Sequence, residues 1–395
     1  MPDPHEPRQL IDSDFVCRKH VGTDLFLADT VRAFVKDDPE ASDRCAFCKR
    51  QGMPVDELAR IVAAGVNKFF DRANDAGVPF DEGDWVFPVM STEEVLADLG
   101  IDDDSPLLHA TVGFLEDDAW VSDGDGWPDE QRLLRDAWDG FSEHIKHRSR
   151  FLFDVLPTQD AFGGVDSLGT RDFLRTLLDA IILAQPILEL KTRHAVYRAR
   201  SFAELSDCPP SVRDYTSPPA DKAAQGRMNP AGIAYFYGAL EPGTAAVEVY
   251  DGNAYAGVAT FKPARTLRLI DLSKARIPSP FDDSVALADH RRRLFLHGFT
   301  NDIARPIVRD GRIHQEYVPT QAVTEYIRFR ARPTFDGVVF ASARTDGRNV
   351  VIFADQGQCL GTGQEAMLAP TTSLQVVEYG APSVSQLPAR KLQGE

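Results

Sequence analysis

Apolar residues recur every three or four positions over residues 10–153, which is the spacing of amphipathic helices. Residues 55–73 have this spacing most clearly. Their apolar positions are Leu58, Ile61, Val62, Val66 and Phe69. Ser91 and Glu94 stand at capping-box spacing and predict a further helix that ends near Gly100. The helical pattern returns at residues 129–150, after an acidic loop at residues 116–129.

A last helical stretch covers residues 171–190, where Pro186 is expected to kink or end the helix. After Lys191, short runs of β-branched and aromatic residues predict strands. These runs are residues 194–198, 233–237, 257–261, 267–272, 337–341, 350–353 and 374–379. Helices are expected at residues 284–299 and 319–329, and Pro242 opens a short helix at a tolerated first-turn position. Strands and helices without strict alternation indicate an α+β fold.

The chain has 395 residues, which suits two domains rather than one core. We predict a mostly helical N-terminal domain with a zinc knuckle at residues 1–155 and a helical bridge at residues 156–190. A mixed α/β catalytic domain is expected at residues 191–385.

Composition restricts the partners. An apolar share of 43% and a charged share of 26% are those of a globular protein. The net charge of −17 would repel a nucleic acid. The pattern of apolar residues predicts neither a membrane span nor a signal peptide. We therefore expect a cytoplasmic protein, with no membrane or nucleic-acid partner and with its five cysteines reduced.

Four residues near the N-terminus have the types and spacing of metal ligands. Cys17-x-x-His20 and Cys45-x-x-Cys48 form two pairs, and pairs at this spacing hold a tetrahedral zinc. Because four protein ligands leave no open position, such a zinc would be structural. Two alternatives stay open: buried thiols beside an ordinary surface histidine, or a redox CxxC. Cys208 and Cys359 are interpreted as ordinary thiols.

A second set of residues has the chemistry to bind a dinucleotide and cleave a glycosidic bond. Arg227 lies in a Gly-rich segment, and its guanidinium fork suits a pyrophosphate. Tyr237 ends an aromatic run, and its ring can stack on a planar group. Glu248 follows on the short helix, where a carboxylate can stabilise an oxocarbenium-like transition state. Ser342 ends a later predicted strand, and its hydroxyl can orient an amide.

This ordered set resembles the RES family, which is named for an arginine, a glutamate and a serine. The resemblance spans residues 197–353 and includes the Tyr197-Arg198 start and the helix that contains Thr320 and Gln321. It implies an ADP-ribosyltransferase-like fold, with Arg227, Glu248 and Ser342 as catalytic residues and with Arg198 and Tyr237 binding substrate. Met228 departs from the family pattern, which usually has an aromatic residue at this position. We expect methionine to make this wall of the substrate site looser.

The resemblance also implies the substrate, NAD+, whose nicotinamide–ribose bond would be cleaved by hydrolysis or phosphorolysis. Transfer of ADP-ribose to a protein is the alternative. Many family members are toxins paired with an antitoxin. The N-terminal region resembles the HEPN/RES-type helical domain found ahead of some RES domains, and we expect it to regulate the enzyme or to act as a passive stability module. An antitoxin, a protein trigger and a homo-oligomer all stay open as partners.

Two other functions are compatible with parts of the sequence, a ribonuclease and a catalytically dead sensor or scaffold. A HEPN-type ribonuclease needs an arginine and a histidine with four to six residues between them, as in Arg292…His297 and Arg309…His314. Both pairs fall in the C-terminal half, and about two such matches are expected by chance. A catalytically dead sensor or scaffold is disfavoured because Arg227, Glu248 and Ser342 are all retained.

Overall fold

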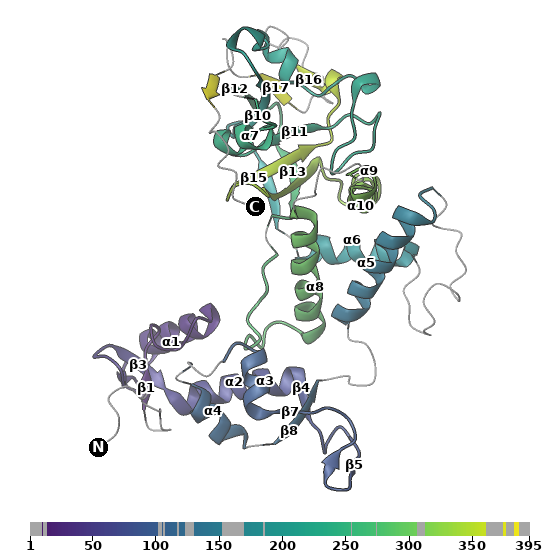
Figure 1. Ribbon diagram of the computed structural model, residues 1–395. Coiled ribbons are helices and arrows are strands. Elements are labelled where there is room, and N and C mark those ends of the chain that lie inside the picture. The colour runs from purple at the N-terminus through teal and green to yellow at the C-terminus, as the bar shows by residue number, and fades with distance from the viewer. Residues whose placement is uncertain are drawn as a thin grey trace. The chain divides into compact units, whose positions relative to one another are not determined.

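A computed structural model of the chain divides into two compact units (Figure 1). Unit 1 comprises Met1–Glu130 and Ile277–Arg291, and unit 2 comprises Gln131–Arg276 and Arg292–Glu395. The residues that the structure describes are 10, 14–101, 105, 107–116, 118–122, 130–151, 170–184, 186–253, 255–273, 275–305, 313–360, 374–376 and 383–386. No helix within these ranges is long and apolar enough to cross a membrane.

Helices carry most of the regular structure of unit 1, as predicted. They are α1 (Leu25–Asp37), α2 (Val55–Phe69), α3 (Thr92–Asp98) and α4 (Leu108–Leu115). Short strands that the sequence did not predict accompany them. They form three small sheets: β1 (Phe15–Val16), β3 (Gln51–Pro54) and β2 (Asp43–Arg44); β4 (Phe70–Arg72), β8 (Ala119–Ser122) and β7 (Met90–Ser91); and the hairpin of β5 (Phe80–Asp81) and β6 (Asp84–Trp85).

The core of unit 1 forms around α2. Leu58, Val62 and Val66 are fully buried at the predicted helical spacing. The predicted capping box is confirmed at the start of α3, where Ser91 and Glu94 each accept a hydrogen bond from the other's backbone N–H. The prediction of a loop at residues 116–129 is partly wrong, because β8 lies within this range and pairs with β4. Residues 123–129 lie outside the described ranges.

Ile277–Arg291 belongs to unit 1 although it lies far along the chain. Phe281 is 1% exposed and packs on Gly65 of α2. Lys68 donates a hydrogen bond to the carbonyl of Asp282 at 3.1 Å, and the ring of Phe69 lies edge-on to His290. The boundary between the units falls inside helix α8 (Leu287–Ala304), which therefore contributes residues to both.

Unit 2 contains one large mixed sheet. Its described strands run in the order β16-β17-β12-β10-β11-β15-β14-β13-β9, and β18 also pairs with β12. Their bounds are β9 (Ile187–Leu190), β10 (Val196–Phe202), β11 (Phe236–Ala239), β12 (Tyr255–Pro263), β13 (Leu267–Asp271), β14 (Gly337–Ala341), β15 (Arg348–Ile352), β16 (Cys359–Leu360), β17 (Leu374–Val376) and β18 (Ser383–Gln386). The pairs β13·β14 and β16·β17 are parallel, and the others are antiparallel.

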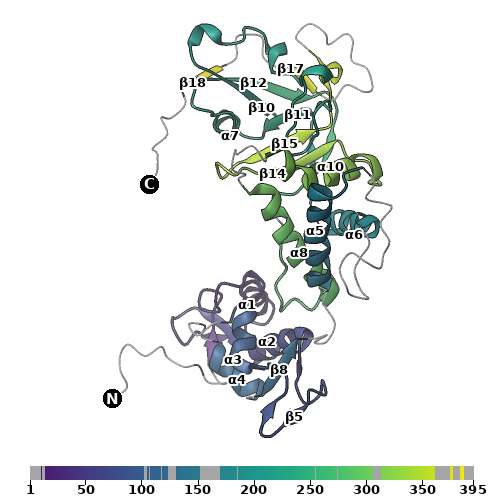
Figure 2. The same ribbon diagram turned by 45° about the vertical axis from the view of Figure 1, so that its right-hand side comes forward.

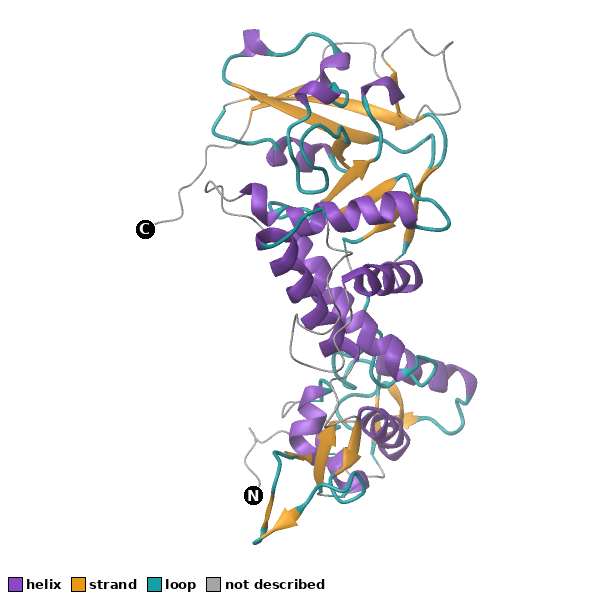
Figure 3. Cartoon of the chain, turned by 90° about the vertical axis from the view of Figure 1, so that its right-hand side faces the viewer, coloured by secondary structure: helices purple, strands orange, loops and turns teal. Residues whose placement is uncertain are grey.

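The middle of this sheet is buried on both faces. Val338 and Phe340 of β14 contribute to one apolar cluster, and Val339 between them contributes to another. Helices cover the first of these faces (Figures 2 and 3). They are α5 (Glu130–His147), α6 (Thr170–Ala184), α8 and α10 (Val318–Arg330). Two shorter helices, α7 (Pro242–Glu248) and α9 (Ile313–Glu316), complete the unit. The α+β fold class is confirmed.

Two sequence-based expectations differ from the structure. The helix predicted at residues 171–190 ends at Ala184, and Ile187–Leu190 instead forms β9 on the edge of the sheet. Pro186 explains this, because proline cannot continue the helix. Helix α5, predicted as part of the N-terminal domain, packs Trp138 and Phe141 into the core of unit 2. The domain boundaries at residues 155 and 190 stay a prediction, and residues 156–169 lie outside the described ranges.

Candidate active site and metal site

A cleft opens in the large sheet where two neighbouring strands separate. In the described sheet, β10 and β11 share one register pair, Tyr197 with Ala239. Beyond that pair the two strands diverge: β10 stays paired with β12, and β11 stays paired with β15. The cleft has a volume of about 310 Å³. Its lining includes Arg198 of β10 and Tyr237 of β11, together with Arg227, Glu248 and Asn349.

Small side chains let α7 approach the sheet closely. Ala245 and Ala246 of this helix are buried against Ala199, Ala239 and Ala256 of the strands. Pro242 stands at the start of α7, as predicted. Glu248 is the last residue of α7, and it lines the cleft.

The carboxylate of Glu248 is held by two donors. Ser342 Oγ lies 2.5 Å and Asn349 Nδ2 lies 2.7 Å from its Oε1 atom. Ser342 Oγ also accepts the backbone N–H groups of Arg344 and Thr345, each at 3.1 Å. A hydroxyl has two acceptor positions and one hydrogen, so the hydrogen of Ser342 is directed to Glu248. Ser342 therefore orients the carboxylate.

Sequence reasoning missed Asn349. It lies on β15 between Ala239 of β11 and Phe340 of β14, and it is 7% exposed. A polar residue at the start of the apolar run Val350–Ile352 was the available signal, because a buried carboxamide needs hydrogen-bond partners.

Arg198 offers a charge to the cleft. Its Nη1 atom is buried and has no hydrogen-bond partner among the described residues, and its guanidinium lies 5.2 Å from the ring of Phe236. Burial, assisted by the neighbouring Arg200, lowers the pKa of Arg198 to about 10. The side chain thus stays cationic at neutral pH, and an anionic group would satisfy its free N–H.

Arg227 lines the same cleft but already has partners. Its guanidinium donates to the carbonyls of Ile303 and Arg305 and lies 5.5 Å from the ring of Tyr317. Burial lowers its pKa, while Tyr317 and Glu248 act in the opposite direction. Arg198 differs from Arg227 in having a fully buried nitrogen with no hydrogen-bond partner among the described residues.

The segment that carries Arg227 has no regular structure and is held by side chains. Gln321 of α10 donates to the carbonyls of Gly226 at 2.8 Å and Asn229 at 3.0 Å. Thr320 donates to the carbonyl of Arg227 at 2.6 Å. Gln321 therefore has a local role in holding this segment.

Met228 does not line the cleft as expected. Its side chain is 1% exposed and packs in the core, 3.1 Å from the hydroxyl of Thr324. The expected loosening of a cleft wall at this position is therefore absent from the described lining. His297 is exposed on α8 and is likewise no part of that lining, while Arg309 lies outside the described ranges.

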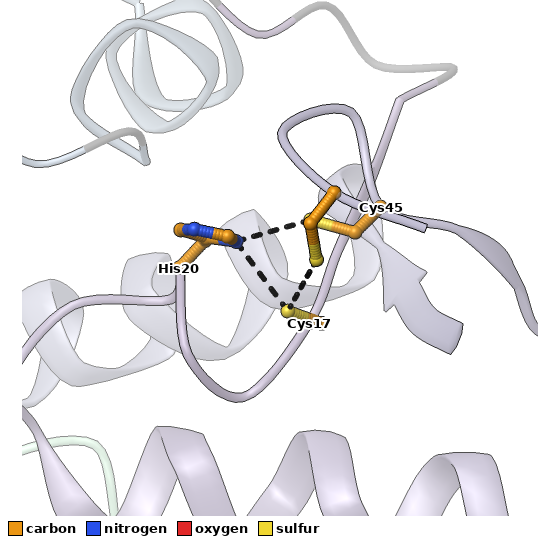
Figure 4. A group of neighbouring side chains, drawn as sticks. Cys17, His20 and Cys45 are labelled. Atoms are coloured by element: carbon orange, nitrogen blue, oxygen red, sulfur yellow. Dashed lines mark hydrogen bonds between the residues drawn. The ribbon is translucent and has the colours of Figure 1, made fainter. Parts of the chain in front are cut away.

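The four predicted metal ligands lie together in unit 1, and Figure 4 shows Cys17, His20 and Cys45 of this group. Their ligand atoms are all within 4.8 Å of one another. His20 Nδ1 is 3.5 Å from the sulfurs of Cys17 and Cys45, and the sulfurs of Cys17 and Cys48 are 3.6 Å apart. A tetrahedral zinc with ordinary bond lengths would place sulfur about 3.6 Å from nitrogen and about 3.8 Å from another sulfur. The donor set and its spacing fit a metal ion.

The thiols differ in their readiness to ionise. Burial raises the pKa of Cys17. Burial acts in the same direction on Cys45, but hydrogen bonds from backbone N–H groups, chiefly that of Phe47, and from His20 lower its pKa to about 6. The thiolate, which is the metal-binding form, is therefore favoured at Cys45.

Comparison with known proteins finds two family models that match separate parts of the chain. The family model described as RES domain matches residues 195–373, close to the span of the resemblance. The model described as HEPN/RES N-terminal domain 1 matches residues 38–158. The crystal structure of the M. tuberculosis MbcT–MbcA toxin–antitoxin complex is similar at 16% identity, over 53% of this chain and 91% of that chain, with a TM-score of 0.29. No curated protein matches the chain.

Proposed function

Because the chain belongs to the family that joins a HEPN/RES N-terminal domain to a RES domain, we propose that it cleaves the nicotinamide–ribose bond of NAD+. RES domains are generally NAD+-acting enzymes. The observation that carries the proposal is the position of Glu248, whose carboxylate is oriented by Ser342 and Asn349 in a cleft that also contains two arginines.

The reaction needs electrostatic help more than proton transfer. When the bond between ribose C1 and the pyridinium nitrogen breaks, its electron pair goes to the nitrogen and neutral nicotinamide leaves. Positive charge then develops on the ribose, and a fixed carboxylate such as that of Glu248 stabilises it. Water adds to C1 and releases a proton to solvent, which gives ADP-ribose.

The arginines suit the other end of NAD+. The unpartnered Nη1 of Arg198 can donate to a pyrophosphate oxygen, and Arg227 adds positive charge to the cleft. The rings of Tyr237 and Tyr317 line the same cleft and can contact the planar parts of the substrate. An ADP-ribosyltransferase-like fold forms part of this proposal, supported by the division of the sheet at β10 and β11.

The test compares three purified full-length proteins incubated with NAD+. The unchanged chain should release nicotinamide, and Glu248→Gln should lose roughly two orders of magnitude in rate. Glu189→Gln is the matched control, because Glu189 is exposed on β9 beside Lys191, and its rate should not change. Absence of nicotinamide release by the unchanged chain would refute the proposed reaction and favour a sensor or scaffold.

Mass spectrometry of the products distinguishes the acceptor. ADP-ribose indicates water, ADP-ribose 1-phosphate indicates phosphate, and a mass increase on a protein indicates ADP-ribosyltransfer. Cleavage of an RNA substrate by the same preparation would instead support the ribonuclease alternative. Growth arrest on expression, dependent on Glu248, would support a role as a toxin or defence effector restrained by an antitoxin or a protein trigger.

We also propose that Cys17, His20, Cys45 and Cys48 hold one structural zinc. Tetrahedral spacing of two sulfur–nitrogen contacts and one sulfur–sulfur contact supports this. Zinc would tie together the chain before α1 and the loop between β2 and β3. With four protein ligands it has no position open for substrate, so its contribution is to stability.

A further inference from the structure

Helix α7, which carries Glu248, cannot hold its own position. It has seven residues, and so short a helix is marginal without outside contacts. Its last carbonyls need donors, as at any helix end, yet its last turn contains no basic residue. The carbonyl of Val247 accepts the backbone N–H of Tyr250 at 3.2 Å, and side-chain donors to this end of the helix come from another part of the chain.

Arg344 supplies them from the loop between β14 and β15, residues 342–347. Its Nη1 atom donates to the carbonyl of Val247 at 2.9 Å and to that of Tyr250 at 2.8 Å. These two carbonyls stand on either side of Glu248 in the chain. An arginine at the carbonyl end of a helix is favoured both by hydrogen bonding and by the helix dipole.

Arg344 also forms a hydrogen bond with Ser342, the residue whose hydroxyl orients Glu248. Its backbone N–H donates to Ser342 Oγ at 3.1 Å, and that hydroxyl donates to the carboxylate of Glu248. One residue thus holds the backbone around Glu248 with its side chain and the orienting hydroxyl with its main chain.

The same loop and the first residue of β15 hold the other end of α7. Glu241, which precedes the helix, accepts the backbone N–H of Arg348 at 2.8 Å. Thr244 and Thr345 are hydrogen-bonded through their hydroxyls at 3.0 Å. The approach is so close at Gly347 that a Cβ there would collide with the hydroxyl of Thr244.

We propose that Arg344 is a positioning residue, which sets the carboxylate of Glu248 for the reaction by holding the end of α7. The proposal rests on the proposed function of Glu248. A displacement of about 1 Å at a reacting group can cost on the order of 100-fold in rate, so a small movement of α7 would be visible in kcat.

A direct substrate contact makes the opposite kinetic prediction. If Arg344 bound a phosphate of NAD+, its loss would raise KM and leave kcat nearly unchanged. The Nη1 atom is already shared between two carbonyls, which favours the positioning role.

The kinetic test uses full-length Arg344→Met and Arg344→Lys with NAD+. For Arg344→Met we expect kcat to fall roughly 10- to 100-fold with KM little changed. Arg344→Lys should recover part of the loss, because an ammonium group can still donate to helix-end carbonyls. The control is Arg332→Met: Arg332 is also exposed and also donates to a helix-end carbonyl, that of Ala331 after α10. An unchanged kcat, or an increase confined to KM, would overturn the proposal.

Hydrogen–deuterium exchange gives a second readout that needs no turnover. In Arg344→Met, the amides of residues 243–250 should exchange faster than in the unchanged chain, and in Arg332→Met they should not. If the unchanged chain releases no nicotinamide, the proposed function fails, but the exchange still decides whether Arg344 holds α7. Equal exchange in Arg344→Met and the unchanged chain would refute that role.

Discussion

The phenolic oxygen of Tyr237 lies 2.6 Å from Oδ1 of Asn229 and 3.0 Å from the backbone nitrogen of Met228. It donates to the first and accepts from the second. Burial raises its pKa, so the hydroxyl stays protonated. Both contacts hold the segment that carries Arg227, which gives Tyr237 a role as an anchor in addition to its place in the cleft.

Tyr237→Phe should therefore weaken folding and activity together. The side-chain oxygen of Asn229 and the N–H of Met228 would both lose their partner, at a cost of about 1–3 kcal/mol in the free energy of unfolding. Urea denaturation and nicotinamide release measure the two effects. Unchanged stability would show that the anchor is dispensable.

Ser342→Ala and Asn349→Ala should each slow NAD+ cleavage less than Glu248→Gln does. Either change leaves Glu248 with one of its two donors. The double variant leaves neither, so its loss in kcat should exceed that of both single variants and approach that of Glu248→Gln. A double variant as active as Ser342→Ala would argue that Asn349 does not orient the carboxylate.

Chelation should destabilise the protein without removing a catalytic group. We expect one zinc per chain in protein purified without chelator, and a lower melting temperature after its removal. Cys48→Ser should lose the metal, whereas Cys208→Ser should keep it, since Cys208 lies in unit 2 and outside the cluster. Elemental analysis well below one zinc per chain would contradict the site.

Stability should fall as the pH drops below about 6.5, in part because of His144. Its side chain is 7% exposed, and burial together with Arg148 lowers its pKa from the ordinary value of 6.5. The unfolded chain then takes up a proton at a higher pH than the folded chain, so acid favours unfolding through this window. His144→Gln should flatten the dependence, whereas His147→Gln, an exposed change on the same helix, should not.

Gly65→Ala should destabilise unit 1. A Cβ at residue 65 would lie 2.6 Å from Cδ1 of the fully buried Phe281, and forcing an extra carbon into a packed core typically costs about 1–3 kcal/mol. Gly113→Ala in α4 is the control, because a Cβ there meets nothing within 4 Å and should be neutral or stabilising. Equal stability of the two variants would contradict the packing of Phe281.

This packing bears on the role of the N-terminal region. A fragment from residue 190 onward would retain Phe281 but lose the α2 residues that bury it. Deletion would therefore expose an apolar surface, and its effect on activity could not be read as loss of regulation alone. Point changes such as Gly65→Ala in the full chain are the better test of regulation.

The sequence by itself determined the residue types and their order. Local spacing was sufficient for α2, for the capping box at α3 and for the paired metal ligands, because each depends on neighbours within a few residues. The order of residue types, through the resemblance to the RES family, also indicated Arg198, Arg227, Tyr237 and Glu248, which all line one cleft. The resemblance to the RES family was likewise a property of that order.

Only the tertiary structure decided how those residues are supported. Asn349, Arg344 and Gln321 act through partners about 90 to 100 positions away, and no local pattern records such contacts. The same holds for the packing of Phe281 on Gly65 and for the pairing of Ile187–Leu190 with β13, although the end of the preceding helix is explained locally by Pro186. A side chain's role at a site depends on which of its hydrogen-bonding atoms are already occupied, and folding alone settles that.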